Sequence, residues 1–238
     1  MDFGLSDEQR QLSDILGNYL ADQLPIDELR AVADQGTGFS DDLWQGLVEL
    51  GLPGLLIPEE HGGSGLGILD AAVVAEALGY GAAPAPYVAS MVMAPLALLR
   101  SGDDAQQAAW LPRIAAGEVR LGLGFEILSG GTRAGDIALK DGKLSGEFSG
   151  ILDGGAATHV LLYLADGWAV IVDTNTDTAE LHSATTIDGT RPLTTVTLTD
   201  ANVEFLDAAN DPVAAAQSVL EDRCYSNSSD SLSFIQLE

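Results

Sequence analysis

The stretch GLLIPEEHGGSGLG, residues 54 to 67, separates two helical patterns and decides how the first half of the chain folds. Its glycines suggest a phosphate-binding loop, a metal site or a tight turn. Gly63, Gly65 and Gly67 lack the G-x-G-x-x-G spacing of a dinucleotide-binding turn, and the segment lies between helical patterns instead of after a strand. The phosphate-loop sequence G-K-[ST] is also missing from the chain.

A metal site is disfavoured in the same stretch. His61 follows Glu59 and Glu60, but three neighbouring residues on one loop make a poor metal cage. Pro58 interrupts the apolar run, and the glycines can supply the positive φ angles that tight turns need. The residues therefore predict a tight turn between helices, and we expect no metal.

Helical patterns lie on both sides of this turn. Ser6 and Gln9 form a capping-box pattern before an apolar stripe, and Ser40 can cap a second helix that ends near Gly51. Three Ala-rich segments continue the pattern: residues 67–79, 87–100 and 104–116. We therefore predict an all-α domain over residues 1–117.

The pattern changes near residue 118, where short runs of Val, Leu, Ile and Thr begin. KDGK at 140–143 is typical of a tight hairpin, and HVLLYLADGWAVIVD at 159–173 predicts two strands around a turn. We expect an antiparallel, barrel-like β-domain over residues 118–207. The fold class is thus α+β, with an all-α domain followed by an all-β domain.

The last segment, residues 208–238, has two parts. Asp211 and Pro212 are suited to begin a helix. Residues 222–238 are rich in Ser and carry no helical stripe. We expect either a disordered tail or a foreign C-terminus that arose by truncation or a shifted reading frame.

Composition limits the partners and the location. The formal net charge is −26, so the chain would be repelled by nucleic acid and by anionic membranes. The longest apolar stretch, residues 85–99, is too short to span a bilayer and contains Pro95. Cys224 is the one cysteine, so an intrachain disulfide cannot form. We expect a soluble, cytoplasmic protein.

Spacing alone predicts no catalytic residues. The sequence contains no nucleophile motif, such as G-x-S-x-G, with which His159 or His182 could act. Cys224 lies in the Ser-rich tail and is not expected to be a nucleophile. A hydrolytic triad is therefore unsupported.

Four segments, in order, resemble the acyl-CoA dehydrogenase family. They are IPEEHGGSG at 57–65, DAAVVAEALGYG at 70–81, LSGEFSGILDGGAATHVLL at 144–162 and TRPLTTVTLTDANV at 190–203. The resemblance extends from residue 1 to about residue 220. It implies that the opening stretch is a loop between two helices of the first domain.

The resemblance also implies a chemistry. Members of the family hold FAD between the β-domain and a C-terminal four-helix domain, and they remove hydrogens from the α and β carbons of an acyl-CoA thioester. Their carboxylate base comes from the C-terminal domain, which we expect to be absent or truncated here. No residue of the chain is therefore assigned a catalytic role, and we expect the chain alone to be inactive.

The segments that resemble the flavin-binding ones depart from the family pattern. In the first segment, the family's T-E-P corresponds to Phe125-Glu126-Ile127, of which only the glutamate is retained, and Leu123 of the same segment is also expected on the cofactor side. The second corresponds to W-I-T or W-I-S and contains Gly150 and Leu152. Phe125 and Leu152 stand where the family has hydroxyl groups, so we expect weak FAD binding or none.

The resemblance places the acyl group against the helix predicted at 87–98. Its substrate-side residues would be Tyr87, Ser90, Met91 and Ala94, together with Ser129 and Thr132 from the loop after the first flavin segment. Apolar side chains and a methionine suit a bulky acyl group, although ordinary helix packing explains them equally well.

We therefore expect a truncated or divergent acyl-CoA dehydrogenase chain. Two alternatives remain open: a non-catalytic partner subunit of a heteromeric acyl-CoA dehydrogenase, and a non-redox β-domain binding module. The partner reading fits family members that act on steroid-like acyl thioesters and consist of two unlike chains. We expect a homo- or hetero-oligomer with another dehydrogenase chain.

Overall fold

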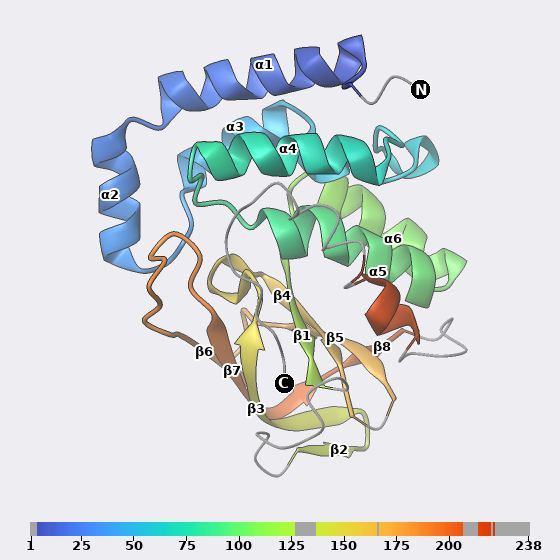
Figure 1. Cartoon of the computed structure of the whole chain (residues 1–238). Helices are drawn as coiled ribbons and strands as arrows, with labels where there is room; N and C mark the ends of the chain where they lie inside the picture. The colour runs from blue at the N-terminus through green and yellow to red at the C-terminus, as the bar shows by residue number, and fades with distance from the viewer. Residues whose placement is uncertain (1–3, 127–136, 166, 207–213, 220, 222–238) are drawn as a thin grey trace.

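The computed structural model describes residues 4–126, 137–165, 167–206, 214–219 and 221. Helices occupy the first half of the chain and strands most of the second half, in the predicted order (Figure 1). The helices lie together over one end of the strands. In the described residues, no helix is both long and apolar enough to cross a membrane.

The α-helices described in the first half of the chain are α1 (Asp7–Gln23), α2 (Ile26–Gln35), α3 (Asp41–Glu49), α4 (Ile68–Tyr80), α5 (Ala94–Ser101) and α6 (Asp104–Ala115). The two caps predicted from the sequence are present. Ser6 and Gln9 exchange the two hydrogen bonds of a capping box at α1. The Ser40 hydroxyl accepts the Leu43 N–H at the start of α3. These polar residues satisfy N–H groups that have no partner inside the helix.

Helix α2 was not predicted from the sequence. It begins after Pro25, carries Asp27 and Glu28 in its first turn, and ends at Gly36 in the left-handed conformation. These are ordinary helix-boundary signals. None of its side chains is fully buried, so α2 contributes little to the core of the helical part.

The helix predicted over 87–100 consists of two parts. Tyr87–Met93, labelled η3, is a π-helix, and α5 follows it from Ala94. Pro95 stands in the first turn of α5 and cannot donate a backbone hydrogen bond. The chain therefore has a wider turn directly before the proline, where the Ala94 N–H donates to the Ala89 carbonyl.

Within the described residues, the strands form two four-stranded sheets, and neither closes into a barrel. Their bounds are β1 (Leu121–Phe125), β2 (Ala138–Lys140), β3 (Lys143–Ile151), β4 (His159–Tyr163), β5 (Ala169–Asp173), β6 (Ala179–Ser183), β7 (Thr194–Asn202) and β8 (Glu204–Phe205). The orders are β1-β4-β5-β8 and β2-β3-β7-β6. The β1–β4 pair is parallel and the other pairs are antiparallel.

Both predicted hairpins are present. Lys140 pairs with Lys143 across the β2–β3 turn, and His159 pairs with Asp173 across β4 and β5. Asp141, in the β2–β3 turn, has φ 52°. Beyond the sheets, residues 214–219 are helical, whereas Ser-rich residues 222–238 lie outside the described part of the chain.

The core has three layers: helices, first sheet and second sheet. Leu121, Leu161 and Ile171 of the first sheet are buried with the helices. The opposite face of the same sheet, with Val160 and Val172, packs in a separate cluster with residues of the second sheet. This alternation along each strand buries both faces of the first sheet. The helical domain and the β-domain therefore share a continuous interface.

Candidate functional site

The opening stretch folds as a tight turn whose N–H groups are already used. Those of Gly62 and Gly63 donate to carbonyl oxygens of Glu59 and Pro58. The N–H of Ser64 donates to the Gly54 carbonyl oxygen over 2.9 Å, within the same loop. A phosphate cradle needs free N–H groups directed at the ligand, so this geometry supports the turn and not the cradle.

The two flavin-like segments meet in space. Leu123 and Leu152 form an isolated antiparallel bridge, with N–H to carbonyl oxygen distances of 3.1 and 2.9 Å. Gly150 precedes the bridge with φ 76° in the last part of β3, where the register with β7 shifts. Long-range backbone pairing thus brings together four of the predicted cofactor residues: Leu123, Phe125, Gly150 and Leu152.

Phe125 has an aromatic partner at this place. Its ring stacks on Tyr163, with ring centroids 5.4 Å apart and the planes 9° from parallel. Tyr163 is fully buried, and its hydroxyl lies 3.3 Å from the Ser101 hydroxyl. Burial raises the pKa of Tyr163 above its ordinary value. Sequence patterns did not identify Tyr163, because its pairing with Phe125 depends on the parallel β1–β4 register.

The retained acid, Glu126, has a structural contact. Its carboxylate accepts the backbone N–H of Ala165 at 3.0 Å, in the β4–β5 connection. The contact ties the end of β1 to the neighbouring hairpin. Ser129 and Thr132, predicted on the substrate side, lie outside the described residues.

The surface formed by Leu123, Phe125 and Leu152, called here the apolar wall, fits an isoalloxazine ring poorly. The backbone groups of Leu123 and Leu152 are used in their mutual bridge, and their side chains are apolar. Phe125 offers a ring that is already stacked. A flavin ring has several polar atoms, and a buried polar atom without a partner is costly.

The predicted substrate-side helix lies at the interface of the two domains. Tyr87, Ser90, Met91 and Ala94 are each at most 1% exposed. The Tyr87 hydroxyl donates to the Ala71 carbonyl oxygen inside the helical domain, at 2.6 Å. The Ser90 hydroxyl donates in the other direction, to the Leu121 carbonyl oxygen of β1 at 3.0 Å. The helix therefore contacts both domains.

One functional candidate was missed in the sequence. Asp153 follows Leu152 and accepts the Ala89 N–H with its carboxylate. An Asp before Gly-Gly at the end of a predicted strand is a signal of a left-handed residue, which could have drawn attention to it.

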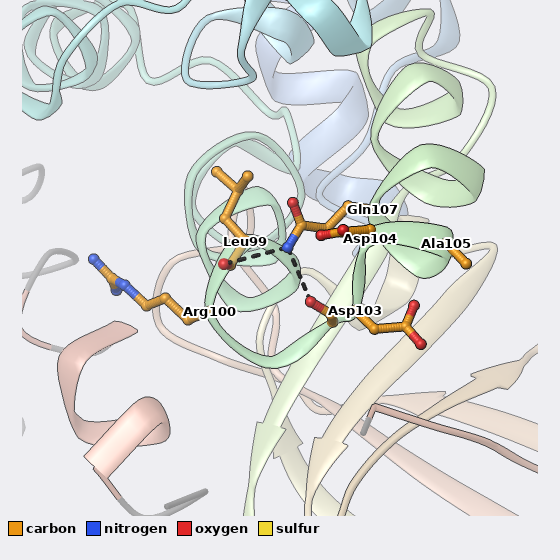
Figure 2. A pocket seen from close by; sticks show the side chains of 7 residues that line it. Leu99, Arg100, Asp103, Asp104, Ala105 and Gln107 are labelled. Atoms are coloured by element: carbon orange, nitrogen blue, oxygen red, sulfur yellow. Dashed lines mark hydrogen bonds between the residues drawn. The ribbon is translucent and has the colours of Figure 1, made fainter. Parts of the chain in front are cut away.

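A surface hollow lies elsewhere in the described part of the chain. It has a volume of about 550 Å³, is open to solvent and lies where α5 connects to α6. The side-chain nitrogen of Gln107 donates to the backbone carbonyl oxygens of Leu99 and Gly102, and Figure 2 shows Gln107 beside Leu99. None of the predicted site residues lines this hollow. Gln107, which lines the hollow, thus links the start of α6 to the end of α5.

The histidines do not gather into a metal site. His159 stacks edge-on against Trp110 at 5.0 Å, and burial lowers the pKa of its imidazole, partly offset by Asp173. His61 and His182 each lie near one glutamate. Within the described ranges, no three His, Cys, Asp or Glu side chains are arranged to hold a metal ion.

Comparisons with known proteins agree with the resemblance. The family model "Acyl-CoA dehydrogenase, N-terminal domain" matches residues 6–118. Mitochondrial isovaleryl-CoA dehydrogenase of Pongo abelii is 29% identical over 178 residues, covering 71% of this chain and 42% of that protein. The (2S)-methylsuccinyl-CoA dehydrogenase of Cereibacter sphaeroides is 38% identical over 132 residues, covering 52% and 24%. The matches thus span less than half of these relatives.

Solved structures show the same fold. The ChsE4–ChsE5 complex from Mycobacterium tuberculosis has a TM-score of 0.79 and 23% identity, covering 97% of this chain and 64% of that chain. The Tcur3481–Tcur3483 steroid ACAD variant has a TM-score of 0.77 and 23% identity, covering 94% and 62%. These structures show the fold. The matched domain model and the dehydrogenase relatives, which include FadE34 of Mycobacterium tuberculosis at 31% identity over 190 residues, place the chain in the acyl-CoA dehydrogenase family, whose members are FAD-dependent oxidoreductases.

Proposed function

We propose that this chain serves the α,β-dehydrogenation of an acyl-CoA thioester as the non-catalytic partner of a second acyl-CoA dehydrogenase chain. One observation carries the proposal. The wall that resembles the family's flavin site presents the Phe125–Tyr163 stack and Leu152 where hydroxyl groups are expected, and Leu152 is paired with Leu123. A chain with such a wall would leave flavin chemistry to its partner.

The structural neighbours support a heteromeric role. ChsE4–ChsE5 is described as a complex, and Tcur3481–Tcur3483 carries the names of two chains. Our chain would contribute its helical and β-domains to a similar assembly. The expectation of an oligomer is thus refined to a pair of unlike chains.

A second candidate is a flavoprotein chain that dehydrogenates acyl-CoA itself. Glu126 supports it, because this acid is retained at the family's position. In the structure its carboxylate binds the Ala165 N–H, a contact that needs no flavin. We therefore rank this candidate second.

The proposed acyl group is bulky and apolar. Its contacts would come from the segment that contains Tyr87, Ser90, Met91 and Ala94. The Ser90–Leu121 hydrogen bond supports this, because it turns the segment toward the β-domain instead of wholly into the helical core. The neighbour described as a steroid ACAD is consistent with a bulky substrate. We further propose a cytoplasmic location, since one cysteine suits a reducing compartment.

The flavin content per chain tests the proposal. The chain is purified alone and after co-expression with a full-length acyl-CoA dehydrogenase chain from the same genome. Flavin absorbance gives the FAD content, and native mass spectrometry gives the chain composition. We expect no stoichiometric FAD in the isolated chain and one FAD for each pair of unlike chains. One FAD per chain in the isolated protein would overturn the partner role and support the second candidate.

A further inference from the structure

Asp153 holds an unusual backbone conformation directly after Leu152. Its φ of 53° and ψ of 19° are left-handed, a region that few residues other than glycine adopt readily. Gly154 and Gly155 follow immediately, so this short turn already uses glycine twice. The contacts of the Asp153 carboxylate supply a reason for a side chain here.

The carboxylate binds a helix that is 64 residues away in the sequence. Its Oδ2 atom accepts the Ala89 N–H at 2.6 Å. Ala89 is fully buried in the first turn of η3, where an N–H has no partner within the helix. A buried N–H needs a partner, and a negative group is favourable at a helix N-terminus. The bond is therefore of the strong, charge-assisted kind.

The neighbouring atoms fix the same part of the helix. The Ala89 carbonyl oxygen accepts the Ala94 N–H and closes the π-helical turn. The next residue, Ser90, donates its hydroxyl proton to the Leu121 carbonyl oxygen. Two consecutive residues of η3 are thus bound to two different parts of the β-domain.

The other end of the turn is also attached to the helical domain. The Arg120 Nε–H donates to the Ala156 carbonyl oxygen at 2.6 Å. The guanidinium carbon of Arg120 lies 4.8 Å from the centre of the Phe39 ring and 5.5 Å from that of Trp44. Residues 153–156 are therefore bound at both ends to groups that pack with the helices.

We propose that Asp153 is a positioning residue, whose carboxylate sets η3 against the bridge between Leu123 and Leu152. The helix and the strand ends then keep one relative position. That η3 faces an acyl group rests on the proposed function. The contact between Asp153 and Ala89 does not, so the two ideas can fail separately.

Amide hydrogen exchange at Ala89 in the full chain tests the proposal. Asp153→Ala should raise its exchange rate about tenfold to a hundredfold, the effect of losing the partner of a buried donor. Asp153→Asn should stay within about threefold of the original, because its side-chain oxygen accepts the same bond and Asn tolerates this backbone. Asp141→Ala is the matched control, since Asp141 has φ 52° on an exposed hairpin.

Three results would overturn the proposal. They are an unchanged Ala89 rate in Asp153→Ala, an equal increase at Leu16 in distant α1, and acceleration at Ala89 by the Asp141 control. If Asp153→Ala does not fold, Asp153→Gly removes the carboxylate without left-handed strain and gives the same comparison. FAD content is measured separately, so a flavin-containing chain would not decide the role of Asp153.

Discussion

The ring of Phe125 lies parallel to the ring of Tyr163, and the two centroids are 5.4 Å apart. The pair joins the last residues of β1 and β4, which are direct partners in the parallel register. Phe125 lacks the hydroxyl group that the family has at this position, but its ring makes a packing contact of its own. It is a packed aromatic residue that completes the end of the sheet, which explains how the site remains stable without a flavin contact there.

The isolated chain should not be half-saturated with FAD at micromolar concentrations. The double variant Phe125→Thr/Leu152→Thr returns hydroxyl groups to two positions. Each hydrogen bond is worth about 0.5–1.5 kcal/mol, so the pair should tighten FAD binding about tenfold to a hundredfold. Quenching of flavin fluorescence during titration measures the affinity.

A control keeps this titration specific. Leu139→Thr makes the same chemical change on β2, which belongs to the other sheet, and should leave FAD affinity unchanged. Saturable binding of FAD to the original chain at micromolar concentrations or tighter would contradict the expectation. It would mean that the apolar wall and the groups around it suffice for the cofactor.

Local signals predicted much of the fold. The capping box of Ser6 and Gln9, the cap at Ser40 and the hairpin from Lys140 to Lys143 depend on neighbours in the sequence, and all are present. Helix α2 was not predicted, although Pro25 and the following acids mark its start, Gly36 marks its end, and Leu29 and Val32 stand three residues apart. These signals are local, so the sequence already contained them.

The site could be predicted only in part. The family resemblance named Leu123 and Leu152, and backbone pairing brings them together. It could not show that Phe125 meets Tyr163, because a parallel pairing joins residues far apart in the chain. The same limit hid the contact of Asp153 with Ala89. The first relationship depends on strand register and the second on the packing of a helix against a turn, and local patterns encode neither.

Tyr87→Phe should lower the free energy of unfolding by about 0.5–1.5 kcal/mol at neutral pH, since it removes the hydrogen bond to the Ala71 carbonyl. Burial raises the pKa of Tyr87 well above its ordinary value. The phenol of the unfolded chain ionises near pH 10. The stabilisation of the folded state by Tyr87 is therefore complete below that pH and is lost as pH rises further. Urea unfolding between neutral and strongly alkaline pH should show a shallower alkaline decline for the variant. Tyr80→Phe, at a residue 96% exposed, should match the original, and an unchanged alkaline decline in Tyr87→Phe would refute the assignment.

His159 should make the fold sensitive to mild acid. Burial lowers the pKa of its imidazole, and Asp173 opposes the shift. The unfolded chain therefore takes up the proton first, near pH 6.5, so stability is complete above that pH and decreases as pH falls. His159→Gln should reduce the fall in urea midpoint between pH 7.5 and pH 5. His182→Gln, at an exposed side chain, is the control, and equal acid sensitivity of all three proteins would disprove this role for His159.

Two adjacent glycines in the opening stretch should respond differently to alanine. Gly62 has φ 82° with open space around its Cα, so Gly62→Ala should cost about 1–2 kcal/mol for the left-handed backbone alone. A Cβ on Gly63 would overlap the carbonyl group of Ile57, which is fully buried and also accepts the Gly65 N–H. Because backbone and not a flexible side chain is in the way, Gly63→Ala should cost more than about 3 kcal/mol. Urea unfolding of both variants compares these losses directly. If Gly63→Ala proves no more destabilising than Gly62→Ala, the close packing of Gly63 on Ile57 is wrong, and with it the tight turn that closes this loop.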